Sequence, residues 1–206
     1  MEIPFRIAVG LLTAVATAVA LHFRLKAAAG GEKVSRKDEG LLLAIAVRTA
    51  GAALWLATFA WLVRPEWMRS TSFPLPDGVR WIGPGLGACG MAAMWWTLAS
   101  LGKNLTDTVA TRANATLVTH GPYRWVRHPF YVAAALLMLS VTLTAANWLI
   151  GLCGLAVIGL LAARTPIEER MLLARFGADY RNYMATTGRF VPRLRGPVRG
   201  GSLRSR

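Results

Sequence analysis

Two short polar segments hold most of the side chains in this sequence that could do chemistry. The polar segment, residues 117–131, reads LVTHGPYRWVRHPFY and carries two histidines, two arginines and two tyrosines between apolar runs. The acidic segment, residues 164–169, reads RTPIEE. Its carboxylates could bind an ammonium group, while histidine, tyrosine and backbone N–H groups could bind a carboxylate. Because aromatic rings also attract cations, the two segments together predict a site for a zwitterionic molecule that carries a further positive charge.

Other kinds of chemistry have no pattern in this chain. The sequence contains no Ser-His-Asp set, no cysteine and histidine cluster at metal-ligand spacing and no phosphate-binding loop. The run GPGLG at 83–87, with Asp107 further on, imitates the glycine-rich loop of soluble nucleotide binders. No strand precedes it and an apolar segment follows, so close packing between helices explains it better. Cys89 and Cys153 lie within apolar runs and are predicted to be buried free thiols.

Five apolar segments must position the two polar ones. Hydrophobic residues make up 54% of the chain and charged residues only 17%, more apolar than is usual for a soluble globular domain. The apolar segments are 3–23, 41–63, 81–101, 130–146 and 148–163. Asn147 alone separates the last two, which are therefore expected to form a tight antiparallel hairpin. We predict an all-α integral membrane protein with about five transmembrane helices.

Two arginines interrupt the first two apolar segments. Arg6 precedes the first apolar run, as in a signal peptide, but the length of the run and the basic residues after it favour a retained helix. Arg48 lies within the second segment, where it either extends to a nearby interface or has a functional role.

Charge predicts the orientation of these helices. A formal net charge of +14 would suggest a nucleic-acid partner, but the basic residues avoid the apolar runs and gather in the connecting segments. With five spans, 24–40, 102–128 and 164–206 lie on one side and together hold 19 basic and 7 acidic residues. The positive-inside rule places that side, with the C-terminus and both polar segments, in the cytoplasm. The alanine- and arginine-rich composition points to a bacterial inner membrane.

The last 43 residues read as non-spanning. Thr165, Pro166 and Glu168 have the pattern of a helix start, with an N-cap, a proline and a capping glutamate. Apolar residues then recur at helical spacing, which predicts a cytoplasmic amphipathic helix. The basic tail, 193–206, is expected to be disordered and either to contact anionic lipid or to be solvated. The predicted regions are three spans in 1–101, a catalytic region in 102–192 and this tail.

Residues 121–131, GPYRWVRHPFY, followed later by RTPIEERMLLARFGADYRNYMATTGRFVP at 164–192, resemble the isoprenylcysteine carboxyl methyltransferase family. The resemblance covers roughly residues 102–193. It implies an integral-membrane enzyme that uses S-adenosylmethionine without a Rossmann domain. Its implied acceptor is a lipophilic or lipid-modified carboxylate. Phospholipid or amine N-methyltransferases and thiol S-methyltransferases share much of this pattern and stay open as alternatives, as does a membrane bundle without catalytic activity.

The resemblance also assigns roles by position. The implied cofactor contacts are Ala115, Thr116, Leu117, Val118, Tyr123, His128, Pro129, Phe130, Tyr131 and Glu168. Arg164 is the implied substrate contact and, with Glu168, the implied catalytic pair. Ala115 stands where eukaryotic members have a histidine, so only a backbone contact is expected there. Neither a nucleic acid nor an obligate protein partner is predicted.

Three residues of the two segments carry a plainer interpretation. Arg127 is expected to be an ordinary positive charge on the cytoplasmic side. Glu169 is expected to be a solvated neighbour of the site, or the partner of Arg170 or Arg164. His120 is expected to lie at the interface without a specific role.

Overall fold

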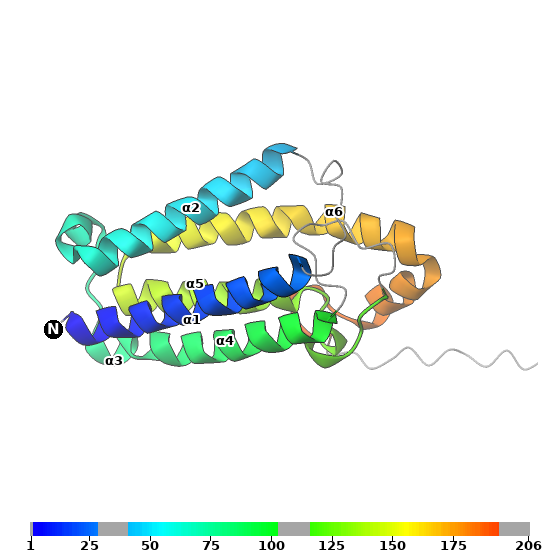
Figure 1. Cartoon of the computed structure of the whole chain (residues 1–206), viewed down its shortest axis with the longest axis horizontal. Helices are drawn as coiled ribbons and strands as arrows, with labels where there is room; N and C mark the ends of the chain where they lie inside the picture. Colours follow the sequence, from blue (N-terminus) through cyan, green and yellow to red (C-terminus); the bar gives the residue numbers. More distant parts are fainter. Residues whose placement is uncertain (1, 29–40, 103–115, 194–206) are drawn as a thin grey trace, which may run out of the picture.

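The computed structural model describes residues 2–28, 41–102 and 116–193 (Figure 1). These residues form helices and turns, with two isolated β-bridges and no β-strand among them. The elements are α1 (Ile3–Ala28), α2 (Leu41–Val63), η2 (Pro65–Thr71), α3 (Asp77–Arg80), α4 (Ile82–Leu101), η4 (Gly121–Arg124), α5 (Pro129–Ala145) and α6 (Trp148–Thr186). The predicted all-helical fold is therefore confirmed for the described part of the chain.

The five long helices alternate in direction along one axis (Figure 1). α5 packs against α1, α4 and α6, while α2 lies along α6. This alternation brings the ends of α1 and α4, the starts of α2 and α5, and the far part of α6 to one end of the bundle. The polar segments were predicted to share one face, and they do lie at this same end.

Within the described ranges, three helices are long and apolar enough to cross a membrane, namely those that include Ile3–Ala27, Leu42–Val63 and Trp148–Thr186. They expose large apolar side chains: Leu42 is 84% exposed, Leu56 69% and Leu155 68%. Such surfaces are stable when lipid surrounds them. α5 is apolar but only 17 residues long, and α4 does not reach the same combination of length and hydropathy. The number of five spans therefore stays a prediction.

Glycines let α4 approach α5 closely. A Cβ atom at Gly83 would lie 2.2 Å from the Thr144 hydroxyl oxygen and 2.8 Å from the Ser140 carbonyl oxygen. At Gly87 it would meet the Ser140 hydroxyl at 2.6 Å. The Ser140 hydroxyl donates a hydrogen bond to the Gly83 carbonyl at 2.7 Å. Close helix packing, rather than ligand binding, is thus the role of the glycine-rich run.

The turn between α5 and α6 is as tight as predicted. Ala146 adopts a left-handed conformation at φ 48°, and Asn147 is the N-cap of α6. Its side-chain oxygen accepts hydrogen bonds from the backbone N–H groups of Leu149 and Ile150 at 3.1 and 3.2 Å. Its amide nitrogen donates to Thr71 at 2.8 Å. The fully buried Asn147 therefore joins the hairpin turn to η2.

The predicted helix start at Thr165 is wrong. α6 continues through Pro166, and the Thr165 hydroxyl donates to the carbonyl of Leu161, one turn earlier in the same helix. The buried residues Ile150, Gly154, Val157, Leu161, Thr165 and Glu169 are spaced three or four apart. One face of the helix therefore stays buried on both sides of Pro166. The proline itself costs the helix one backbone hydrogen bond.

Gly177 marks the real break in α6. Its φ of 54° and ψ of −121° are non-helical, and a positive φ favours glycine. The expected amphipathic helix is thus the far part of α6, and its last turns fold back beside the polar segment (Figure 1).

Several smaller expectations change. α1 extends beyond residue 23 to Ala28. Both cysteines are free, but Cys89 is exposed and Cys153 is half-buried, because neither faces the interior of the bundle. Arg48 is exposed on α2. Of the predicted disordered tail, 193–206, Arg193 is described and donates to the Ala185 carbonyl. Residues 194–206 lie outside the described part of the chain, so their disorder stays a prediction.

Candidate functional site

The polar and acidic segments meet where α5 begins. His128 stands at the N-cap position of α5, and Pro129 is its first residue. One and a half turns of α6, from Arg164 to Glu169, lie beside this helix start. The hairpin of α5 and α6 leaves this end of the bundle and returns to it. This geometry explains why segments more than 30 residues apart in the sequence share one site.

Glu168 is the centre of one cluster. The Tyr131 hydroxyl donates to its Oε1 at 2.6 Å. Arg164 Nε lies 3.1 Å from the same oxygen, and His128 Nδ1 lies 3.4 Å from Oε2. The Glu168 side chain keeps 17% of its surface exposed. These four residues, all predicted for the site, are therefore brought together around a carboxylate that a ligand can still reach.

Glu169 is the centre of a second cluster, contrary to the expectation that it is solvated. Its side chain is only 5% exposed. Arg127 Nε donates to its Oε1 at 2.9 Å, and Arg127 Nη2 lies 2.8 Å away. Arg189 Nε donates to the same oxygen at 3.2 Å, and His128 Nε2 lies 3.3 Å from it. The burial is possible because two guanidinium groups neutralise the carboxylate.

Arg127 also differs from its expected role. Its side chain is 6% exposed and is not a free surface charge. Beyond the pair with Glu169, its Nη1 donates to the carbonyls of Thr187 and Met184. Arg127 therefore links the start of α5 to the acidic segment and to residues 184–187 at the end of α6.

A third segment, 180–190, completes the site and has no counterpart among the predicted site residues. The Tyr183 hydroxyl donates to the Tyr123 carbonyl at 2.6 Å. The backbone N–H groups of Arg127 and His128 donate to the carbonyls of Gly188 and Arg189 at 2.8 and 3.1 Å. These bonds form a short parallel bridge between the two segments.

A local signal for this third segment exists at Gly188. A Cβ atom there would lie 1.8 Å from the Val191 carbonyl oxygen, so the turn after α6 accepts only glycine. A glycine flanked by a threonine and an arginine in a basic C-terminal region indicates a turn. The sequence does not indicate that this turn pairs with residues 126–128.

Aromatic rings surround the glutamates on one side. The rings of His128 and Tyr131 are stacked, with centroids 5.4 Å apart and an interplanar angle of 11°. Phe190 lies 5.7 Å from His128 and 6.4 Å from Tyr131. Phe130 meets Tyr131 edge-on at 5.9 Å. This group of rings beside a carboxylate offers the two features that bind an organic cation.

Electrostatics favour a positive charge on His128. Burial lowers its pKa, but hydrogen bonds to Glu168 and Glu169 outweigh burial, so the pKa is raised above its usual value. Burial, together with the nearby Tyr183 and Glu168, raises the pKa of Tyr123, which keeps that phenol neutral. The Tyr180 hydroxyl, in a side chain 1% exposed, has no hydrogen-bond partner among the described residues.

The remaining predicted residues differ in their exposure. Pro129 is buried, Phe130 is 38% exposed, Leu117 and Val118 are half-buried, and Thr116 is exposed. Ala115 falls outside the described residues, so its expected backbone contact stays a prediction. The described residues contain no group of three or more histidine, cysteine, aspartate or glutamate side chains that could hold a metal ion.

Known proteins resemble this chain in sequence. The family model of the isoprenylcysteine carboxyl methyltransferase (ICMT) family matches residues 85–174. Protein-S-isoprenylcysteine O-methyltransferase of Tribolium castaneum is 32% identical over 130 residues, which cover 60% of this chain and 46% of the relative. The cobalt-zinc-cadmium resistance protein CzcN of Cupriavidus metallidurans is 33% identical over 120 residues, which cover 57% of this chain and 54% of that protein.

A solved structure agrees in fold. The eukaryotic intramembrane Ras methyltransferase ICMT superposes with a TM-score of 0.52 and 24% identity, over 74% of this chain and 53% of that one. The chain spans about half the length of these relatives. The helical membrane fold is shared, and the matched region contains α5 and the acidic segment. Over residues 85–174 this chain therefore resembles the isoprenylcysteine carboxyl methyltransferase family in sequence, and it shares the fold of a solved member.

Proposed function

We propose that this protein is an integral-membrane methyltransferase that uses S-adenosylmethionine and methylates a carboxylate on a lipophilic, isoprenylcysteine-like acceptor. The match to the family model and the activity named for the Tribolium relative support methyl transfer. One structural observation carries the assignment to this site. Glu168 stands between Tyr131 on α5 and Arg164 on α6, beside a group of aromatic rings.

The residues present fit a sulfonium cofactor with an amino-acid end. Glu168 would bind the ammonium group, because its side chain is a carboxylate that is still 17% exposed. The rings of Tyr131 and Phe190, whose centroids lie 6.4 Å apart, would face the sulfonium by cation–π attraction. The buried Tyr180 hydroxyl, which lacks a partner in the described residues, is a donor available for a carboxylate or a bridging water.

The charge of the site favours a carboxylate acceptor. Three guanidinium groups, those of Arg127, Arg164 and Arg189, face the two carboxylates of the acidic segment. The cluster therefore carries one net positive charge even with His128 neutral. A planar guanidinium can bind a carboxylate through two parallel hydrogen bonds. Arg164, 16% exposed and at the edge of the cluster, would orient the acceptor in this way.

When bound, S-adenosylmethionine supplies the methyl group, so that its C–S bond breaks as a C–O bond forms on the acceptor. A carboxylate is already ionised at neutral pH and needs no general base. Alignment of the acceptor is then the main task of the protein side chains. An amine or thiol acceptor would need a base, but both glutamates already accept hydrogen bonds or pair with arginine. This engagement favours the carboxylate over the N- and S-methyltransferase alternatives.

The site also fits a membrane-bound acceptor. It lies at one end of a helix bundle whose outer surface is apolar, so a prenyl chain could enter laterally between helices while the cofactor enters from water. The charge asymmetry of the sequence supports a cytoplasmic site, and the composition supports a bacterial inner membrane. A lipid-modified acceptor is the proposed partner, without nucleic acid or an obligate protein subunit.

The test uses purified protein in neutral detergent with S-adenosylmethionine labelled in its methyl group. Acceptors are N-acetyl-S-farnesylcysteine, the same compound with its carboxylate amidated, a phosphatidylethanolamine and an alkyl thiol. We expect label transfer to the free carboxylate and loss of transfer to the amide. Transfer only to the amine or thiol would overturn the carboxylate assignment. Failure of the protein to bind the cofactor by calorimetry would support the inactive-bundle alternative.

A further inference from the structure

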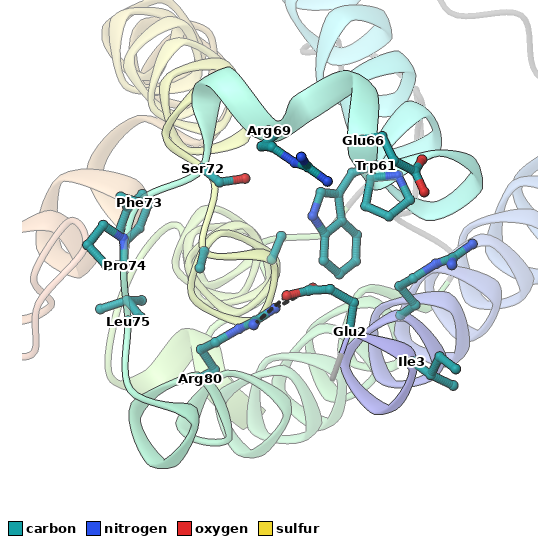
Figure 2. Close-up of a pocket in the computed structure, with 14 residues that line it drawn as sticks. Glu2, Ile3, Trp61, Glu66, Arg69, Ser72, Phe73, Pro74, Leu75 and Arg80 are labelled. Carbon is teal, nitrogen blue, oxygen red and sulfur yellow. Dashed lines mark hydrogen bonds and ion pairs between the residues drawn. The ribbon is translucent and has the colours of Figure 1, made fainter.

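A cavity lies at the end of the bundle opposite the candidate site. Its volume is about 580 Å³, and it lies between the start of α1, the end of α2, η2 and the turn after α5 (Figure 2). The 17 residues of α5 separate it from His128, a length of about 25 Å for a helix. The cavity is therefore separate from the site where methyl transfer is proposed.

An ion pair forms one side of this cavity. Arg80 donates from both terminal nitrogens to the two oxygens of Glu2, at 2.8 Å each. Figure 2 shows the two side chains facing each other. Arg80 is 6% exposed, and its Nε donates to the Thr144 carbonyl at 3.0 Å. Its guanidinium also lies 3.8 Å from the centroid of the Phe5 ring. Glu2 and Arg80 thus neutralise each other and hold the start of α1 against the end of α5 at one side of the cavity.

The remaining charges of the cavity are positive in sum. Arg6 donates from Nε and Nη2 to the carbonyls of Leu62 and Val63 at the end of α2. These acceptors are neutral and do not cancel its charge. Arg69 is exposed on η2 and extends toward Trp61 (Figure 2). Glu66, also exposed on η2, is the third ionisable residue outside the Glu2 pair. Two cations and one anion leave the cavity with a net positive charge.

The size of the cavity, its apolar wall and the tryptophans around it favour an amphiphilic ligand over a free anion. Its volume falls in the range of small-molecule sites, far above the roughly 30 Å³ share of one water molecule in the liquid. Much of the wall is apolar, including the buried Trp61 and residues 73–75. Trp67, Trp81 and Trp148 are about half to two-thirds exposed at this end of the bundle. Tryptophan at such a position is typical of the headgroup level of a bilayer.

We propose that this cavity binds the phosphodiester headgroup of a membrane phospholipid. Arg69 donates charge-assisted hydrogen bonds to the phosphate, and Arg6 supplies a second positive charge. The glycerol and upper acyl chain lie against the apolar wall. This inference concerns a binding site remote from the candidate methyl-transfer site and does not depend on the proposed function.

The experiment uses the delipidated protein, residues 1–206, in neutral detergent and native mass spectrometry. The probes are dioleoylphosphatidylglycerol, dioleoylglycerol, which has the same chains without phosphate, and inorganic phosphate. The test variant is Arg69→Gln. The control is Arg64→Gln, since Arg64 is exposed on the same connector, lies over the Trp67 ring at 5.8 Å and is not part of the cavity wall.

We expect the phosphatidylglycerol dissociation constant to rise about tenfold in Arg69→Gln, through loss of a charge-assisted hydrogen bond, and to stay unchanged in Arg64→Gln. Dioleoylglycerol should bind more weakly than the phospholipid. Equal effects of the two substitutions, or equal binding of the two lipids, would overturn the proposal. Displacement of the phospholipid by millimolar inorganic phosphate would show a site for a free anion instead of a lipid. Unchanged thermal midpoints of both variants verify that each is folded.

Discussion

Replacement of Glu169 by glutamine is the substitution that most directly tests the architecture of the candidate site. Glu169 is 5% exposed and pairs with Arg127, which is 6% exposed, at 2.8 Å. Glutamine preserves the volume and one acceptor oxygen but removes the charge. Arg127 would then be buried without a neutralising partner. Breaking a buried pair from one side in this way costs about 3–5 kcal/mol.

Part of that cost is compensated. Arg189 is 43% exposed and can be solvated when Glu169 loses its charge, so it adds at most about 1 kcal/mol. Arg127 keeps its bonds to the carbonyls of Thr187 and Met184, which satisfy donors without neutralising charge. We therefore expect the lower part of the range, about 3 kcal/mol, for Glu169→Gln.

The assay is the thermal unfolding of the purified protein in detergent. A loss of about 3 kcal/mol corresponds to a fall in the midpoint of roughly 6–12 °C for a chain of this size. Asp179→Asn is the matched control, because Asp179 is exposed on the same helix, and its effect should stay within about 0.5 kcal/mol. The double variant Arg127→Met with Glu169→Leu should recover much of the loss, since it removes both buried charges.

The reasoning would be refuted by a midpoint for Glu169→Gln within the error of the Asp179→Asn control. That result would mean that water reaches Arg127 and that the cluster is not buried in the folded protein. A double variant no more stable than Glu169→Gln would instead show that packing of the replaced side chains, and not charge, limits stability.

Three further predictions follow from distances and pKa directions at single residues. Tyr131→Phe removes a 2.6 Å hydrogen bond to Glu168 while keeping the stacked ring, so cofactor affinity measured by calorimetry should fall about tenfold; no change would remove Tyr131 from the site. Gly83→Ala should destabilise the protein by about 1–3 kcal/mol in thermal unfolding, because its Cβ would lie 2.2 Å from a hydroxyl oxygen of α5. Gly85→Ala, which meets nothing within 4 Å, should be neutral or stabilising, and equal effects at both positions would contradict the close packing. The pKa of His128 is raised on folding, so its contribution to stability is complete below about pH 6.5 and is lost as the pH rises through the folded-state pKa. His128→Gln should therefore flatten the pH dependence of the thermal midpoint. An equally steep pH profile in the variant would exclude His128 as the source of that dependence.

The sequence predicted the long helices well, because each is encoded locally. An apolar run of about 20 residues has few alternatives to a helix in a bilayer. The bounds of α2, Leu41–Val63, are those predicted; α4 begins one residue later than predicted, and α5 begins and ends one residue earlier. The prediction failed at Thr165, where a local capping pattern competes with a buried stripe that continues through Pro166. Packing along the whole helix outweighed the capping pattern.

By itself the sequence determined that the polar and acidic segments lie at one end of the bundle, since the alternation of helices and a one-residue turn at Asn147 leave no other place for them. It also determined which residues carry the family resemblance. Only the tertiary structure decided that Glu169 and Arg127 are buried partners and that Arg189 and Phe190 belong to the site. The reason is physical: burial and charge pairing depend on the break at Gly177, which folds residues 180–190 onto the start of α5, and a contact between such distant segments has no periodic signal in the sequence.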